Sequence, residues 1–73
     1  MNETTKELVA IAAAVADKCQ PCFVYHYKQA RELSIGDDWI REAVQLAKDI
    51  RVSGDKHMDE FAQRRKKTKR SNT

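Results

Sequence analysis

Hydrophobic residues recur at helical spacing along four short segments of this chain, and no stretch alternates as a half-buried strand would. The first segment shows the pattern most clearly, because Leu8, Ile11 and Val15 follow one another three and four residues apart. This spacing places all three side chains on one face of an α-helix. The sequence therefore predicts an all-α fold.

Capping and breaking residues set the bounds of the predicted helices. Thr4 and Glu7 have the spacing of a capping box at the start of the first helix. Pro21 fits the first turn of the second helix, where its missing N–H breaks no hydrogen bond. We expect a small bundle of about four helices, over approximately residues 4–18, 20–33, 38–52 and 55–67.

Two short segments are predicted to separate the later helices. Gly36 follows the second helix and is expected to end it in the left-handed conformation. Asp37 or Asp38 would then cap the third helix. Ser53-Gly54-Asp55 repeats this order of stop and cap, so we expect a break there before the fourth helix.

The length of 73 residues limits the chain to one domain with a modest core. Small scaffolds usually gain stability from disulfides, metal ions or oligomerisation. A disulfide between two cysteines three residues apart would close too small a loop to restrain the unfolded chain. We therefore expect residues 1–63 to form a single helical domain that is completed by oligomerisation.

Basic residues are concentrated at the end of the chain, although the formal net charge is only +3. Of the 14 Lys and Arg residues, 6 lie within residues 64–73, which leaves residues 1–63 with 8 basic and 11 acidic residues and a charge of −3. Basic tails can bind nucleic acid, but they are more often solvated helix ends. We expect a frayed or disordered tail over residues 64–73, and we do not expect nucleic acid as a partner.

The start of the chain favours a location in the cytoplasm. Residues 1–6 are polar without an export signal, and the apolar stretch over residues 8–16 is too short to span a bilayer. Two cysteines in such a chain are typical of redox or metal chemistry rather than of a secreted disulfide framework. We therefore expect a cytoplasmic protein without a membrane partner.

Cys19, Cys22 and His26 form a Cys-x-x-Cys-x-x-x-His motif in a chain with no other cysteine. The two thiols can close a disulfide, and His26 lies one helical turn after Cys22 on the same face, within reach as a base. Both cysteines are predicted near a helix N-terminus, where free N–H groups and the helix dipole stabilise a thiolate. A thiolate attacks a peroxide or a disulfide, and the second thiol resolves the product.

Glu7 precedes Cys19 by twelve residues and has two competing roles. It can complete the capping box, or it can orient His26 and stabilise the protonated imidazole. In the second role, nucleophile, base and carboxylate would follow the logic of hydrolytic triads. The spacing leaves both roles open and favours the cap.

Two other interpretations of the cysteines are open. Tetrahedral zinc takes four ligands, and the candidates for them are Cys19, Cys22, His26 and the distant His57. However, structural zinc pairs are usually matched by a second pair at regular spacing, and His57 stands alone. Alternatively, both cysteines could pack as plain buried thiols.

The pattern Glu7-x11-Cys19-x2-Cys22-x3-His26 resembles the signature of the AhpD-like, carboxymuconolactone decarboxylase superfamily. Residues 6–12, 31–36 and 40–43 are also similar to that family, so the resemblance covers roughly residues 4–52. It implies an all-helical fold with the cysteine pair at a helix start, in obligate oligomers that are commonly trimers or hexamers. The presence of both cysteines favours the alkylhydroperoxidase-type branch.

The resemblance also implies a role for each site residue. Cys22 would be the thiol that attacks peroxide, and Cys19 would be the more exposed resolving thiol that meets the electron donor. His26 and Glu7 would form the proton relay. Pro21 is a departure, because the best-known peroxidase members carry a histidine immediately before the second cysteine.

We therefore predict a thiol-dependent antioxidant oxidoreductase whose catalytic residues are Cys22, Cys19, His26 and Glu7. Its substrate would be a peroxide or a disulfide, its electron donor a thiol protein, and it would need no metal or organic cofactor. The alternative is a non-catalytic helical oligomer that acts as a scaffold or interaction protein. A peroxidase and a disulfide reductase are not separated, because both need the same two thiols and base.

Overall fold

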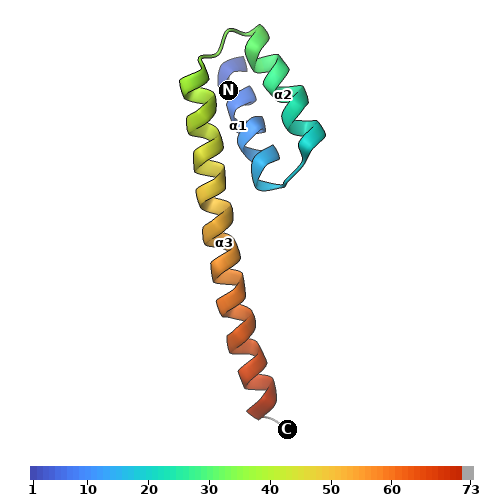
Figure 1. Ribbon diagram of the computed structural model, residues 1–73, viewed down its shortest axis with the longest axis vertical. Coiled ribbons are helices and arrows are strands. Elements are labelled where there is room, and N and C mark those ends of the chain that lie inside the picture. Colours follow the sequence, from blue (N-terminus) through green and yellow to red (C-terminus); the bar gives the residue numbers. More distant parts are fainter. Residues whose placement is uncertain (72–73) are drawn as a thin grey trace.

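The computed structural model describes the backbone of residues 1–71 and the side chains of residues 1–65. Three helices make up this part of the chain (Figure 1): α1 spans Glu3–Ala16, α2 spans Gln20–Glu32 and α3 spans Asp37–Ser71. The prediction of an all-α fold is confirmed. The basic tail expected to be frayed or disordered falls largely beyond Arg65, outside the residues whose side chains are described.

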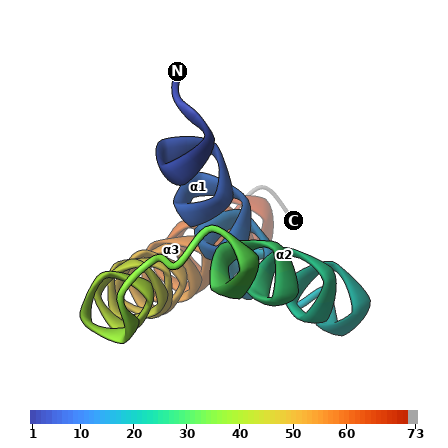
Figure 2. The ribbon, with the colours of Figure 1, turned by 90° about the horizontal axis from the view of Figure 1, so that it is seen from above.

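Helix α1 lies between the other two helices, and both α2 and α3 pack against it (Figure 2). Its most buried side chain, Ile11, is completely removed from solvent. All three helices and the connection between α2 and α3 contribute to the core cluster, which consists of Ile11, Ala30, Ile35 and Ile40. Partly buried side chains surround this cluster, namely Leu8, Phe23, Tyr27 and Val44.

The cap of α1 differs from the capping box that we predicted. Helix α1 begins at Glu3, and its N-cap is Asn2, whose side-chain oxygen accepts a hydrogen bond of 2.8 Å from the backbone N–H of Thr5. Because the helix starts earlier than expected, Thr4 lies inside its first turn and cannot serve as the cap. Glu7 is therefore available for a different partner.

A Schellman motif joins α1 to α2. Lys18 takes a left-handed conformation with a φ of 59° and donates its backbone N–H to Val15. The N–H of Cys19 then bonds to the carbonyl of Ala14 at 2.9 Å. These two bonds satisfy the last carbonyls of α1 and turn the chain sharply. The motif places Cys19 directly at the N-cap of α2, and Pro21 lies in the first turn of that helix as predicted.

A second Schellman motif ends α2 and corrects our assignment of Gly36. Ser34, with a φ of 60°, is the left-handed residue, whereas Gly36 has no positive φ. The N–H of Ile35 bonds to Ala30 at 3.0 Å, and its side chain is buried in the core. The left-handed residue must precede Ile35 for this side chain to turn inward, which explains the shift from Gly36 to Ser34.

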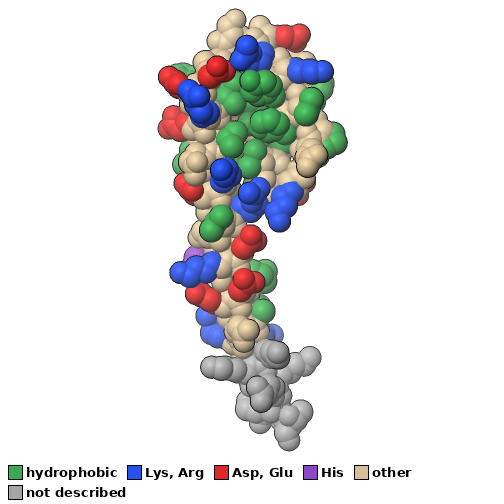
Figure 3. Space-filling model, in the orientation of Figure 1, with side chains coloured by type: hydrophobic (Ala, Val, Ile, Leu, Met, Phe, Trp, Pro, Cys, Tyr) green, Lys and Arg blue, Asp and Glu red, His purple; other side chains and the backbone are tan. Residues whose placement is uncertain are grey.

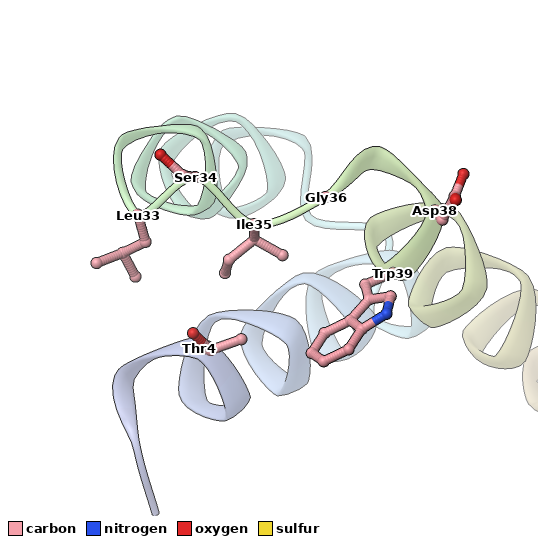
Figure 4. Close-up of a pocket in the computed structure, with 7 residues that line it drawn as sticks. All are labelled: Thr4, Leu33, Ser34, Ile35, Gly36, Asp38 and Trp39. Carbon is pink, nitrogen blue, oxygen red and sulfur yellow. The ribbon is translucent and has the colours of Figure 1, made fainter.

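The connection between α2 and α3 covers the start of α1 (Figure 4). The carbonyl of Gly36 accepts the N–H of Ile40 at 3.2 Å, so Gly36 begins the hydrogen bonds of α3, and Asp37 and Asp38 lie in its first turn. We expected Asp37 or Asp38 to cap α3, but both residues lie inside its first turn. Figure 4 shows that Trp39 and Ile35 point toward the first turn of α1 beneath this connection.

Helix α3 continues through the Ser53-Gly54-Asp55 segment, where we predicted a break. The third and fourth predicted helices are therefore one helix, which extends well beyond α1 and α2 (Figure 1). A single glycine costs about 1 kcal/mol inside a helix, and good helix formers on both sides can offset that cost. Gly54 also lacks the left-handed φ that a helix stop would need.

Replacing Gly54 with alanine should therefore stabilise the helix by about 1 kcal/mol. An added Cβ would meet no other atom within 4 Å, so no clash opposes this gain. Helicity by circular dichroism and the thermal midpoint of the full chain measure the effect. If Gly54 were instead a left-handed stop, alanine would be strained there, and both quantities would fall.

Candidate active site

Cys19 and Cys22 are joined by a disulfide at the N-terminus of α2, with their Cα atoms 5.3 Å apart. Cys19 is the N-cap residue, and its Sγ accepts the backbone N–H of Cys22 at 3.3 Å. The local sequence produces this geometry, since the Schellman motif delivers Cys19 to the cap and Pro21 favours the first turn of the helix. A thiolate on Cys19 would therefore receive a helix N–H and the positive end of the helix dipole.

The exposure of the two cysteines is the reverse of what we expected. Cys22 is exposed in the single chain, whereas Cys19 is half-buried. Cys19 is held against the end of α1 by its hydrogen bond to Ala14. Cys22 lies three residues further along α2, beyond this turn, so solvent reaches it more easily.

Glu7 and His26 form the contact that links α1 to the cysteine-bearing helix. The Oε1 atom of Glu7 lies 2.8 Å from the Nδ1 atom of His26, and the side chains are 14% and 30% exposed, respectively. An ionised carboxylate only accepts hydrogen bonds, so Nδ1 carries the hydrogen and Nε2 is left to take up a proton. Glu7 therefore contacts His26 and does not take part in capping α1, whose cap is Asn2.

A cavity of about 400 Å³ brings the disulfide and the histidine together. Cys19, Cys22 and His26 all line it, and Asp17 and three alanines of α1 form its opposite wall. The four residues singled out in the sequence thus form one connected group, with Glu7 reaching the cavity through His26. His57 does not line this cavity; it is exposed on α3.

Metal ligation was one of the open interpretations of these residues. Within the described part of the chain, no group of three or more His, Cys, Asp or Glu side chains is arranged to hold a metal ion. Both cysteine sulfurs are instead bonded to each other. The donor set that the zinc interpretation required, with His57 as the fourth ligand, is therefore not assembled.

Arg51 is a residue near the disulfide that sequence reasoning missed. Its Nη1 atom donates a hydrogen bond of 2.8 Å to the carbonyl of Val15, which lies 36 residues earlier in the chain. Arg51 also lines a second cavity next to Cys19. The sequence contained a signal that Arg51 faces the core. It continues at helical spacing the core-facing stripe of α3, which consists of Ile40, Val44 and Ala47.

Replacing Glu7 with glutamine should slow alkylation of the reduced protein at neutral pH about tenfold, since an oriented base contributes substantially to proton transfer. Glutamine keeps the size of Glu7 but loses the negative charge that holds the imidazole and stabilises its protonated form. Glu3→Gln is the matched control, because Glu3 is an exposed carboxylate on the same helix. Equal rates in the two variants would show that the contact with His26 is only structural.

No described helix combines the length and the apolar character that crossing a membrane requires. Comparisons with curated proteins and with solved structures gave no significant match.

Comparison with family models matched residues 1–51 to the carboxymuconolactone decarboxylase family. The matched region contains α1, α2 and the part of α3 that packs against α1, and it ends at Arg51. It therefore includes the disulfide and the contact between Glu7 and His26. The sequence pattern, the all-helical fold and the extent of this match agree, and the chain belongs to the carboxymuconolactone decarboxylase family.

Proposed function

We propose that this protein is a thiol-dependent antioxidant oxidoreductase that cycles between the Cys19–Cys22 disulfide and the dithiol. The observation that carries the proposal is the shared cavity, which both cysteines and His26 line while Glu7 contacts the Nδ1 atom of His26. A reversible disulfide, a base and an orienting carboxylate are the groups that thiol redox chemistry needs. The family match is consistent with this role.

In the proposed oxidative step, the Cys22 thiolate attacks the terminal oxygen of a hydroperoxide. The O–O bond breaks, a sulfenic acid forms on Cys22, and the alkoxide leaves. His26 first takes the proton of the Cys22 thiol to form the thiolate. It then gives this proton to the alkoxide, which becomes an alcohol. Cys22 suits this role because it is exposed and lies one helical turn before His26.

In the proposed resolving step, the Cys19 thiolate attacks the sulfenic sulfur of Cys22. The S–O bond breaks, water leaves after protonation, and the disulfide closes. The position of Cys19 at the helix N-cap favours its thiolate, because the backbone N–H of Cys22 and the helix dipole stabilise the negative charge. A thiol donor then returns two electrons and two protons to regenerate the dithiol, so the cycle runs without a metal or an organic cofactor. We propose that it takes place in the cytoplasm, where thiol donors are abundant.

The rate of thiol alkylation against pH in the reduced protein tests this function. We expect one thiol to react with an apparent pKa well below the ordinary value of about 8.5. Cys19→Ser and Cys22→Ser identify which thiol it is, and His26→Ala should raise that pKa. Ordinary thiol reactivity in both single-cysteine variants would remove the redox function and leave the helical scaffold as the better interpretation.

We also propose that the chain acts as a homo-oligomer. Hydrophobic side chains gather on the face of the broad end that Figure 3 shows, between α2 and α3, and a second apolar area lies between α1 and α3. Leu46 and Ile50 on α3 are 56% and 68% exposed, and together with Val9 on α1 they line an apolar cavity of about 400 Å³. A second copy of the chain over the cavity between α1 and α3 would remove Val9, Leu46 and Ile50 from water, and a core this small needs such burial.

Sedimentation velocity of the wild type and of Ile50→Glu tests self-assembly. We expect the wild type to form a defined oligomer, such as a trimer or hexamer, and the variant to dissociate because it places a charge in the apolar face. Lys48→Glu changes an exposed charge on the same helix and should leave the oligomer intact. A wild type that stays monomeric across concentrations would rule out the oligomer.

A further inference from the structure

The disulfide lies between two cavities of different chemical character, and Cys19 lines both of them. The first cavity, described above, contains His26, Cys22 and the acidic side chain of Asp17. The second has a volume of about 260 Å³ and lies on the side of α3. Cys22 and His26 do not line it, so Cys19 is the cysteine of the pair that borders this cavity.

Two cations line the second cavity, and no acidic residue is among the seven that form it. Lys18 reaches it from the turn between α1 and α2, and Arg51 reaches it from α3. Ala14, Val15 and Phe23 supply an apolar floor. An apolar floor with convergent cations suits a small organic molecule that carries a negative charge.

The guanidinium group of Arg51 is anchored by one hydrogen bond, and its other N–H groups can donate to a ligand. Its Nη1 atom is anchored to Val15, and this is its one hydrogen bond among the described residues. Arginine has five N–H groups in a planar fork that matches the two oxygens of a carboxylate. Since Arg51 is half-buried, its charge is less screened than that of a fully exposed residue.

We propose that the cavity beside Cys19 receives a thiol donor that carries a carboxylate, and that Arg51 selects it by binding that carboxylate. This deepens the proposed function, on which it rests, by naming the class of the electron donor and the sulfur that it attacks. Lys18 adds a second positive charge, and the apolar floor holds the carbon skeleton of the donor.

The exchange follows from the placement of the two sulfurs. The donor thiolate attacks Sγ of Cys19, the Cys19–Cys22 bond breaks, and a mixed disulfide forms between Cys19 and the donor. Cys22 leaves as a thiolate on the side of His26, which supplies its proton. A second donor thiolate attacks the donor sulfur of the mixed disulfide and releases Cys19. Two donor thiols are thus oxidised to one disulfide, and the protein disulfide is reduced to two thiols.

The same mixed disulfide forms in reverse when a reduced Cys19 thiol attacks an external disulfide, which gives a direct test. The probes are dithiobis(nitrobenzoate), which carries carboxylates, and its neutral bis-amide, which keeps the same reacting bond. The proteins are Cys22→Ser, in which only Cys19 reacts, and the matched control Cys19→Ser, in which only Cys22 reacts. The readout is the ratio of the rate with the carboxylate probe to the rate with the amide probe.

Adding Arg51→Gln to the Cys22→Ser protein should lower this ratio about tenfold at low ionic strength, and added salt should reduce the difference. Arg51→Lys keeps the charge and should retain most of the ratio. In the Cys19→Ser protein, Arg51→Gln should leave the ratio unchanged. The amide rate also reports any general damage to the fold, because such damage would affect both probes.

Selection by Arg51 would be overturned if Arg51→Gln left the ratio of the carboxylate-probe rate to the amide-probe rate unchanged. It would also be overturned if the ratio fell equally in the Cys22→Ser and Cys19→Ser proteins. Either result would leave the thiol function intact. Ordinary reactivity of both thiols toward the amide probe would instead overturn the proposed function and the donor assignment with it. The two failures are therefore distinguishable in one set of measurements.

Discussion

Replacing Cys22 with serine is expected to abolish catalytic turnover, with a loss of at least about a hundredfold in steady-state rate. A serine hydroxyl is too weak a nucleophile at neutral pH to attack a hydroperoxide, and it cannot close a disulfide with Cys19. Consumption of an organic hydroperoxide with dithiothreitol as the electron donor measures this loss. Reduction of a small disulfide under the same conditions separates peroxidase from disulfide reductase activity.

The Cys19→Ser variant distinguishes the roles of the two thiols. Without added thiol, we expect it to consume one equivalent of hydroperoxide and to leave a sulfenic acid on Cys22 that a selective reagent can trap. His57→Ala is a suitable control, because His57 is exposed on α3 and does not line the site cavity. If the single equivalent were consumed by Cys22→Ser instead, Cys19 would be the attacking thiol and the assignment would be reversed.

Replacing Ile11 with alanine is expected to lower the free energy of unfolding by about 2–5 kcal/mol. Ile11 has no exposed surface, and it packs in a core cluster that contains only four buried residues. A small domain has a total stability of roughly 5 kcal/mol, so the loss would leave much of the protein unfolded. Urea denaturation followed by circular dichroism measures it.

Val24→Ala provides the matched control for Ile11→Ala. Val24 is also a β-branched residue in a helix, but it is 52% exposed on α2, and its truncation should change stability by less than about 0.5 kcal/mol. Similar losses in the two variants would show that stability does not depend on this core. The core matters for the site because Ile11 lies one helical turn after Glu7 on the same face of α1.

Features that depend on local spacing were predictable from the sequence. The stripe of Leu8, Ile11 and Val15 placed a helix there, because helical periodicity is a property of nearby residues. Pro21 marked the start of α2, and the spacing from Cys22 to His26 put both on one helical face. The pairing of Cys19 with Cys22 was available in the same way, since only short-range geometry is involved.

The sequence was less informative about where a helix ends when two neighbouring residues could each end it. Ser34 rather than Gly36 took the left-handed conformation, because Ile35 had to enter the core. Gly54 was expected to stop a helix, yet α3 runs through it. The signal of a glycine is the same in both settings, and the contacts and propensities of the surrounding residues determine which conformation wins.

The sequence by itself determined the helical class, the position of the cysteine pair and the face that His26 shares with Cys22. Residue spacing left the role of Glu7 open, and the tertiary structure decided that Glu7 meets His26 across 19 residues and that Arg51 reaches Val15 across 36. The physical reason is that helix periodicity and caps depend on residues within one or two turns. Contacts between helices depend instead on how the buried faces of α1, α2 and α3 fit together, and no local spacing encodes that fit.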